Sequence, residues 1–194
     1  PGRKLPVLVF IHGGAFREGS ASSPLYEASE LARRGGLVVI TFNYRLGPFG
    51  FLVSTADGVH GNAGLWDQRA ALSFVSRNAA TFGGDASSVT LSGESAGAMS
   101  IAVHLSLNES AALFQRAIMQ SAPMSYRYRS VRLANKLSLS FRKRLGCDSL
   151  LCMQEEPAAT CAAAGVMVGL PRAVGDFLYW GPVHGGRSGV PHDP

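Results

Sequence analysis

The chain has 194 residues, of which 46% are hydrophobic and 16% are charged, proportions typical of a globular domain. Eighteen Lys and Arg residues against thirteen Asp and Glu give a net charge of +5. These basic residues are scattered along the chain, which argues against a nucleic-acid-binding surface. No apolar run approaches the ~18 residues that a membrane-spanning helix needs. We therefore expect neither nucleic acid nor a membrane span.

Apolar runs alternate with segments of helical character. Residues 5–12 (LPVLVFIH) and 37–42 (LVVITF) are almost continuously apolar, as in parallel strands covered on both faces. Between them, residues 23–34 carry acidic residues early and arginines late, which suits a helix. Residues 43–64 form a long connection rich in Gly and aromatic residues, and loops of this length are often functional.

The same alternation continues toward the C-terminus. Asn62 is a candidate N-cap for a helix, and a basic amphipathic helix is expected near residues 130–145. Strands that alternate with helices predict right-handed crossovers and a doubly wound, mostly parallel α/β sheet. The remaining expected elements are a helix at 62–78, a strand at 89–91, a helix at 95–107 and a strand at 117–119.

The sequence GESAG, residues 93–97, matches G-x-S-x-G between an expected strand and an expected helix. In that context a sharp turn presents the serine hydroxyl at the sheet edge, and the glycines permit close backbone approach. Ser95 is therefore the candidate nucleophile for acyl transfer. Five residues alone could match by chance in a Gly- and Ser-rich stretch, so their context decides.

A second glycine-rich segment, HGGAF at residues 12–16, follows the first expected strand. An acyl-transfer enzyme needs backbone N–H groups there to stabilise a developing oxyanion. We expect the donors to be the amides of Gly14 and Ala15, completed by the amide of Ala96 after the nucleophile. The alternative is a simple turn that ends the strand, but the pairing with G-x-S-x-G favours an oxyanion hole.

Several longer blocks resemble one family. They are HGGAF, NYRLGPFGFL (43–52), GNAGLWDQRAAL (61–72), FGGDASSVTLSGESAGAMS (82–100) and LFQRAIMQSA (113–122). In this order they resemble the type-B carboxylesterases, the cholinesterase-like branch of the α/β hydrolases. The resemblance is strongest over residues 5–122, and it implies that residues 1–194 are an incomplete α/β-hydrolase domain. It further implies an acylated Ser95, an oxyanion hole at Gly14, Ala15 and Ala96, a small carboxylic ester as substrate, and no cofactor.

The chain departs from the family pattern at three positions. Gly185 stands where the family has an Asp before Gly, and Ala86 and Ala122 replace its usual Pro and Gly. These departures concern local turns rather than the nucleophile. The resemblance also implies that Arg45 and Asp67 form a buried ion pair between the long loop and the next helix; the alternative is two solvated charges.

A serine nucleophile needs a histidine base oriented by a carboxylate, in the chain order Ser, acid, His. His104 lies roughly 13 Å along the expected helix from Ser95, at ~1.5 Å per residue, and is expected to be a packed helix residue. His184 and His192 follow no convincing strand. The resemblance places the triad acid and His beyond residue 194, as in a chain cut from a longer protein. A complete minimal hydrolase that uses His184 or His192 is the alternative.

Several other polar residues have more than one interpretation. Glu94 could tune the base or anchor the local structure. His12 and His60 have no clustered partners, so no metal site is expected. A non-catalytic adhesion or binding protein could share the same blocks, but such cholinesterase-like proteins typically lack the serine that stands at position 95.

Three cysteines are too few for a disulfide scaffold, and their odd number leaves at least one unpaired within the chain. Cys147 and Cys152 enclose a short loop and could pair in an exported protein. They could equally remain reduced core thiols. The sequence leaves the state of these two residues and of Cys161 open.

Overall fold

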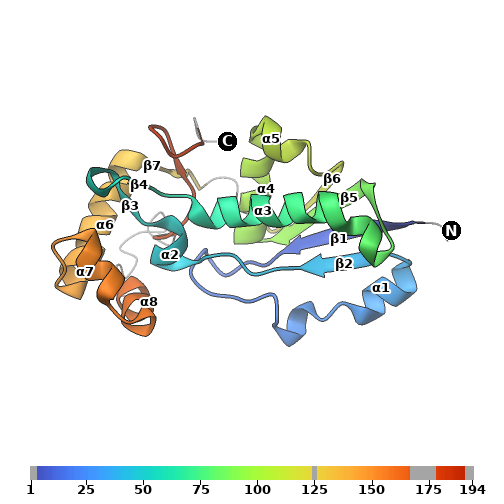
Figure 1. The fold of residues 1–194 in the computed structure, drawn as a ribbon, viewed down its shortest axis with the longest axis horizontal. Helices are drawn as coiled ribbons and strands as arrows, with labels where there is room; N and C mark the ends of the chain where they lie inside the picture. The colour runs from blue at the N-terminus through green and yellow to red at the C-terminus, as the bar shows by residue number, and fades with distance from the viewer. Residues whose placement is uncertain (1–3, 124–125, 167–177, 191–194) are drawn as a thin grey trace.

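A four-stranded parallel sheet forms the centre of the computed structural model, which describes residues 4–123, 126–166 and 178–190. The strand order is β2-β1-β5-β6 (Figure 1). These strands are β1 (Leu5–Ile11), β2 (Val38–Thr41), β5 (Gly84–Glu94) and β6 (Arg116–Gln120). In the central register Val9 lies between Ile40 and Leu91. The predicted mostly parallel α/β architecture is confirmed.

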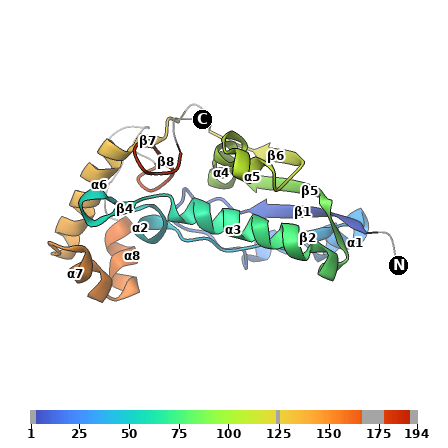
Figure 2. The same ribbon diagram turned by 45° about the horizontal axis from the view of Figure 1, so that its top comes forward.

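Helices pack against this sheet, and further helices and two small strand pairs lie beyond one end of it. The figures place α6, α7 and α8 together at the end of the molecule toward which β1 points (Figures 1 and 2). The helices are α1 (Ser29–Gly35), α2 (Gly47–Phe51), α3 (Ala63–Asn78), α4 (Ala96–Ser106), α5 (Asn108–Ala111), α6 (Val131–Leu145), α7 (Leu150–Glu155) and α8 (Ala158–Val166). The pairs are β3 (Val53–Ser54) with β4 (Val59–His60) and β7 (Arg129–Ser130) with β8 (Val183–His184).

Two expected elements differ from the structure by more than one residue at an end. The helix expected at 23–34 is divided into a 3-10 turn, Pro24–Tyr26, and α1, because Glu27 is extended and ends the turn. The Glu27 carboxylate then accepts a hydrogen bond from the Ser29 amide at 2.9 Å, which favours a new start at α1. The strand expected at 89–91 extends over Gly84–Glu94: Gly84 pairs with Leu5 of β1, and after a register shift residues 89–93 pair with residues 7–11.

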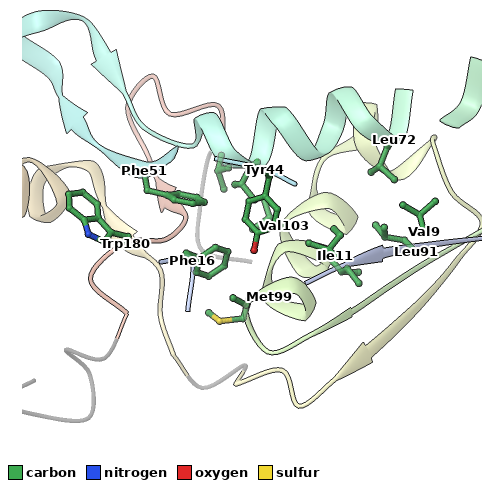
Figure 3. Close-up of a cluster of buried hydrophobic side chains, with 14 of the residues drawn as sticks. Val9, Ile11, Phe16, Tyr44, Phe51, Leu72, Leu91, Met99, Val103 and Trp180 are labelled. Atoms are coloured by element: carbon green, nitrogen blue, oxygen red, sulfur yellow. The ribbon is translucent and has the colours of Figure 1, made fainter. Parts of the chain in front are cut away.

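The hydrophobic core lies along one face of β1 and continues beyond the end of that strand. Val9, Ile11 and Leu91 are fully buried in the sheet, and Phe16 and Phe51 extend the same cluster toward Trp180 (Figure 3). The opposite face of β1 is only half-buried. The sequence predicted that both faces of this strand would be covered, but only one face is fully buried.

Asn62 links the start of α3 to a segment far away in sequence. It occupies the predicted N-cap position, but with φ 61° and without a side-chain capping bond. Its buried amide instead donates to the carbonyls of Val183 at 2.8 Å and Ser188 at 3.1 Å, and accepts from the Val183 amide at 2.8 Å. Asn62 thus stands at the predicted N-cap position, but its side chain does not cap the helix, because it is bonded to residues 183–188 instead.

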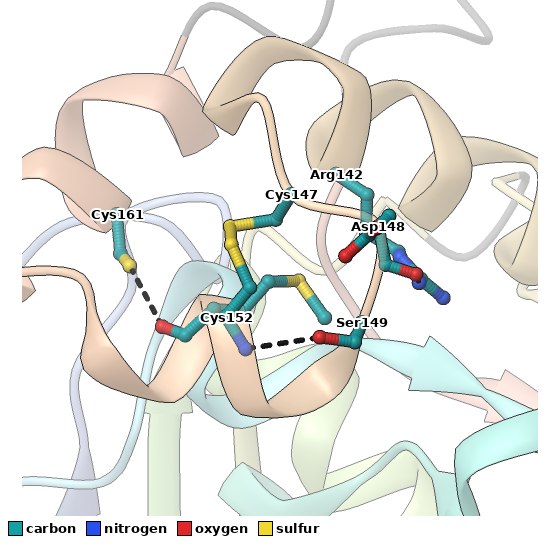
Figure 4. The surroundings of a disulfide bond; sticks show 7 residues. Arg142, Cys147, Asp148, Ser149, Cys152 and Cys161 are labelled. Atoms are coloured by element: carbon teal, nitrogen blue, oxygen red, sulfur yellow. Dashed lines mark hydrogen bonds between the residues drawn. A yellow bond between two sulfur atoms is a disulfide. The ribbon is translucent and has the colours of Figure 1, made fainter.

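A cysteine pair joins the end of α6 to α7. Cys147 and Cys152 form a disulfide, and Ser149 between them caps α7 by accepting from the Cys152 amide at 3.1 Å (Figure 4). Cys161 is a free, buried thiol on α8, and its burial raises its pKa. The structure thereby selects one of the two cysteine states that the sequence left open.

Candidate active site

Ser95 occupies the turn between β5 and α4. Its φ of 53° and ψ of −117° lie outside the regions that non-glycine residues usually adopt, a conformation that costs about 1–3 kcal/mol. The turn is held on both sides: the Ser95 amide donates to the Gln120 carbonyl at 2.9 Å, and the Ser95 carbonyl accepts from the Met99 amide at 2.9 Å. The residue itself is half-buried.

The two glycines of GESAG are required by close backbone contacts. A Cβ atom at Gly93 would lie 2.7 Å from the Gly97 carbonyl carbon, and one at Gly97 would lie 2.1 Å from the Ile11 carbonyl oxygen. Real Cβ atoms do not approach other atoms this closely. The start of α4 is therefore packed directly against the end of β1, as the expected strand-to-helix turn requires.

The HGGAF loop lies against Ser95. A Cβ atom at Gly13 would lie 3.3 Å from the Ser95 Cβ and 2.7 Å from a carboxylate oxygen of Glu94. The next three residues, Gly14, Ala15 and Phe16, all have positive φ, at 108°, 54° and 57°. The two segments singled out in the sequence thus meet in space.

Phe16 anchors this loop in the core, a role that the sequence analysis missed. Its side chain is fully buried and contacts the Phe51 ring edge-on, with centroids 5.2 Å apart. Its carbonyl also accepts from the Gly47 amide at 2.7 Å. The aromatic residue that ends HGGAF was the available signal, because a large apolar side chain after two glycines fixes a loop that the glycines leave free.

Three backbone amides of the HGGAF and GESAG segments have no recorded acceptor among the described residues. Among the hydrogen bonds recorded for the described residues, none is donated by the amide of Gly14 or Ala15. Ala96 is the first residue of α4, so its amide has no helical carbonyl four residues earlier. The Gly14 carbonyl, in contrast, accepts from the amides of Arg17 and Glu18, both at 3.0 Å, which stabilises the loop.

His12 holds the start of this loop through contacts with Gly13 and Tyr44. Its Nδ1 donates to the Gly13 carbonyl at 2.8 Å, and its ring stacks on Tyr44 with centroids 4.6 Å apart. The Tyr44 hydroxyl donates to the His12 carbonyl at 2.9 Å. Burial lowers the pKa of His12, although the bond to Gly13 opposes this shift. Within the described ranges, no three His, Cys, Asp or Glu side chains form a group that could hold a metal ion.

The model of the carboxylesterase family matches residues 1–194. This chain belongs to the carboxylesterase family. Among curated relatives, it is 49% identical over 150 residues to the para-nitrobenzyl esterase of Bacillus subtilis (strain 168), covering 76% of this chain and 30% of that protein. It is 44% identical over 189 residues to the probable N-octanoylanthranilate hydrolase AqdA2 of Rhodococcus erythropolis, covering 93% of this chain and 40% of that protein.

Solved esterase structures share the fold. A PNB esterase superimposes with a TM-score of 0.90 at 39% identity and covers 100% of this chain, which in turn covers 42% of that structure. The Geobacillus stearothermophilus carboxylesterase EST55 at pH 6.2 gives a TM-score of 0.85 at 40% identity, covering 94% and 38%. The fold is therefore that of the α/β hydrolases, and the chain spans less than half the length of these relatives.

Two of the three histidines after Ser95 lie in the part of this carboxylesterase-family chain that the structure describes. His104 is fully buried in α4 and its Nε2 lies 2.9 Å from Oε1 of Gln68, as expected of a packed helix residue. His184 is half-buried in β8, which pairs with β7. His192 lies outside the described residues. Within the part of the chain that the structure describes, no recorded hydrogen bond joins a histidine to Ser95.

Arg45 and Asp67 form the ion pair that the resemblance implied, but it is not buried. The guanidinium makes two 2.7 Å bonds to the carboxylate, and the Arg45 amide adds a third at 3.0 Å. The side chains are 55% and 27% exposed, respectively, which corrects the expectation of burial. Partial burial raises the pKa of Asp67, but the hydrogen bonds and charge of Arg45 together hold it below its usual value. The pair still joins the loop after β2 to α3.

A second ion pair, between Asp57 and Arg142, was not predicted. Nη1 of Arg142 lies 3.1 Å from the Asp57 carboxylate, and these side chains are only 15% (Arg142) and 25% (Asp57) exposed. Arg142 also donates to the Asp148 carbonyl. The two charges are 85 residues apart in sequence, so no local pattern could have indicated the contact.

Proposed function

We propose that the full-length protein is a serine carboxylic-ester hydrolase with Ser95 as its nucleophile. The observation that carries this proposal is the contact between the strained Ser95 turn and the HGGAF loop, where a Cβ at Gly13 would lie 3.3 Å from the Ser95 Cβ. Acyl transfer requires a strained serine at a strand-to-helix turn, beside a loop whose backbone N–H groups are not already hydrogen-bonded.

The reaction has two halves. The Ser95 hydroxyl attacks the ester carbonyl carbon while a base takes its proton, and the amides of Gly14, Ala15 and Ala96 donate to the resulting oxyanion. The alcohol then leaves with a proton, which gives an acyl-enzyme. Water attacks the acyl-enzyme by the same steps, releases the carboxylic acid and restores the serine. No cofactor is required for this chemistry.

The substrate class we propose is a small carboxylic ester. The names of the relatives, a para-nitrobenzyl esterase and a probable N-octanoylanthranilate hydrolase, support hydrolysis of an acyl compound. A non-catalytic binding protein is disfavoured, because its turn would have no reason to keep a serine in a strained conformation.

The base and its carboxylate are assigned to sequence beyond residue 194, on the family resemblance. Within the described residues His104 is engaged with Gln68, and His184 lies on a strand paired with β7. We further propose that the 194-residue chain alone hydrolyses esters at near-background rates, because an oxyanion hole without a general base leaves most of the rate enhancement unrealised. Activity of this chain that is lost in His184→Ala would instead favour the minimal-hydrolase alternative.

The proposal is tested by Ser95→Ala in the full-length protein, with Ser106→Ala, at the far end of α4, as the matched control. Hydrolysis of p-nitrophenyl acetate should be abolished in the first variant and unchanged in the second. A fluorophosphonate probe should label Ser95 of the wild-type protein, as located by peptide mass. Hydrolysis by Ser95→Ala above about a thousandth of the wild-type rate would reject the assignment, since loss of a triad nucleophile costs far more.

A further inference from the structure

A row of buried polar side chains joins α3 to the first turn of α4. Gln68, Ser100 and His104 are each 0% exposed. Nε2 of Gln68 donates to the Ser100 hydroxyl at 3.1 Å, and that hydroxyl donates to the Ala96 carbonyl at 3.0 Å. The other end of the Gln68 amide, Oε1, lies 2.9 Å from Nε2 of His104.

The direction of every bond in this row is fixed. The Ala96 carbonyl can only accept, so the Ser100 hydroxyl donates to it and must accept from the Gln68 amide nitrogen. Gln68 therefore turns its oxygen toward His104, whose Nε2 carries the proton. Burial lowers the pKa of His104 to about 4, so the ring is neutral at pH 7 and the row has a single protonation state.

The row ends at the residue next to the nucleophile. Ala96 is the first residue of α4, and its amide is one of the three proposed oxyanion donors. Among the described residues Nδ1 of His104 has no hydrogen-bond partner, whereas the buried polar atoms of Gln68 and Ser100 are bonded. Bonded polar groups of this kind specify one relative position of two elements more than they stabilise them. Here the two elements are α3 and the turn of α4 that carries Ser95 and Ala96.

We propose that Gln68 and Ser100 are positioning residues that hold the first turn of α4 in register with α3 and so fix the Ala96 amide relative to Ser95. This inference rests on the proposed serine-esterase function. Neither residue touches the ester. Their contribution is to the alignment of a donor that meets the charge of the transition state, and small misalignments of such groups lower the rate of the chemical step.

Ser100→Ala is the first test, made in the full-length protein. Alanine keeps the helix but leaves the Gln68 amide without its acceptor. We expect kcat for p-nitrophenyl acetate to fall about tenfold with KM unchanged, because the lost alignment matters in the transition state rather than in substrate binding. Ser100→Thr keeps the hydroxyl and should restore kcat to within about twofold of the wild type.

Ser106→Ala is the matched control. Ser106 lies on the same helix and its hydroxyl also donates to a helix carbonyl, that of Val103 at 2.7 Å. It takes no part in the bonds of Gln68 to Ser100 and His104, so its removal should leave kcat unchanged. Gln68→Met, of similar volume but without hydrogen bonds, provides a second variant on the other helix. The double variant Gln68→Met/Ser100→Ala should lose no more activity than the worse single variant, because the two residues act as one unit.

The outcomes separate this inference from the proposed function. If Ser95→Ala abolishes hydrolysis while Ser100→Ala and Gln68→Met keep wild-type kcat and lower only the unfolding midpoint, the row is purely structural and the inference is wrong. If Ser95→Ala keeps its activity, the proposed function fails first. A tenfold loss of kcat that Ser100→Thr restores, with Ser106→Ala unaffected, supports the positioning role.

Discussion

Around Ser95, backbone segments pack directly against one another. Glycines at positions 13, 93 and 97 leave no room for a Cβ, and the close backbone contacts are made where strands end. Around α6 and residues 183–190, side chains far apart in sequence make the links instead, as Asn62 does with Val183 and Arg142 with Asp57. The first region is specified by short motifs that can be recognised in the sequence. The second region depends on contacts between residues about 85 to 126 positions apart.

The largest effect is expected at Asn62. Asn62→Ala removes three buried hydrogen bonds and places Ala at φ 61°, so we expect a loss of about 4 kcal/mol in the free energy of unfolding. Asn78→Ala is the control, because Asn78 lies at the other end of α3 and makes one exposed bond to the Phe74 carbonyl. Denaturant unfolding measures both. Equal losses in the two variants would contradict the anchoring role of Asn62.

Gly97→Ala tests the backbone contacts. The added methyl group would lie 2.1 Å from the Ile11 carbonyl, so β1 and α4 must separate, which we expect to cost roughly 3 kcal/mol of stability and about a hundredfold of activity. Gly83→Ala is the control: its φ is 77°, but no atom lies within 4 Å of the added Cβ. That variant should lose about 1 kcal/mol and no activity. Wild-type esterase rates in Gly97→Ala would show that the turn tolerates displacement.

The fold and the Ser95 turn were predictable for the same reason. Buried parallel strands carry continuous apolar runs, and GESAG and HGGAF need small residues at fixed positions because their backbones touch, so local sequence specified both. Phe16 could have been recognised, since it ends the HGGAF motif. The Asp57–Arg142 pair and the Gln68–Ser100–His104 row could not, because each joins elements whose packing only the folded sheet determines.

The pH dependence of stability should report on His104. Its pKa is about 4 in the folded chain and near 6.5 when unfolded, so between these values the unfolded chain binds a proton that the folded chain does not. The free energy of unfolding should therefore fall by up to about 3 kcal/mol as pH drops from 6.5 to 4, and this contribution should stay constant below pH 4. His104→Gln, which can donate to Gln68 but does not titrate, should flatten that part of the curve. Identical pH curves for both proteins would reject this burial effect.

The smallest effects distinguish the two ion pairs. Asp57 and Asp67 are similarly exposed, at 25% and 27%, but their arginine partners are 15% and 55% exposed. Asp57→Ala should thus cost about 2 kcal/mol, whereas Asp67→Ala should cost under about 1 kcal/mol because solvent screens the pair. Midpoints of urea unfolding for the two variants provide the comparison. A larger loss for Asp67→Ala would mean that exposure does not rank these pairs.

The φ of 53° at Ser95 also bears on how such a domain drifts over generations. A glycine at this position would adopt the turn without the steric penalty that serine carries. If selection for catalysis were lost, replacement of this serine by glycine would increase the stability of the protein. Backbone strain at such a residue is retained only while its function is under selection. Under the proposed function, the serine is retained in this strained conformation for its reactivity.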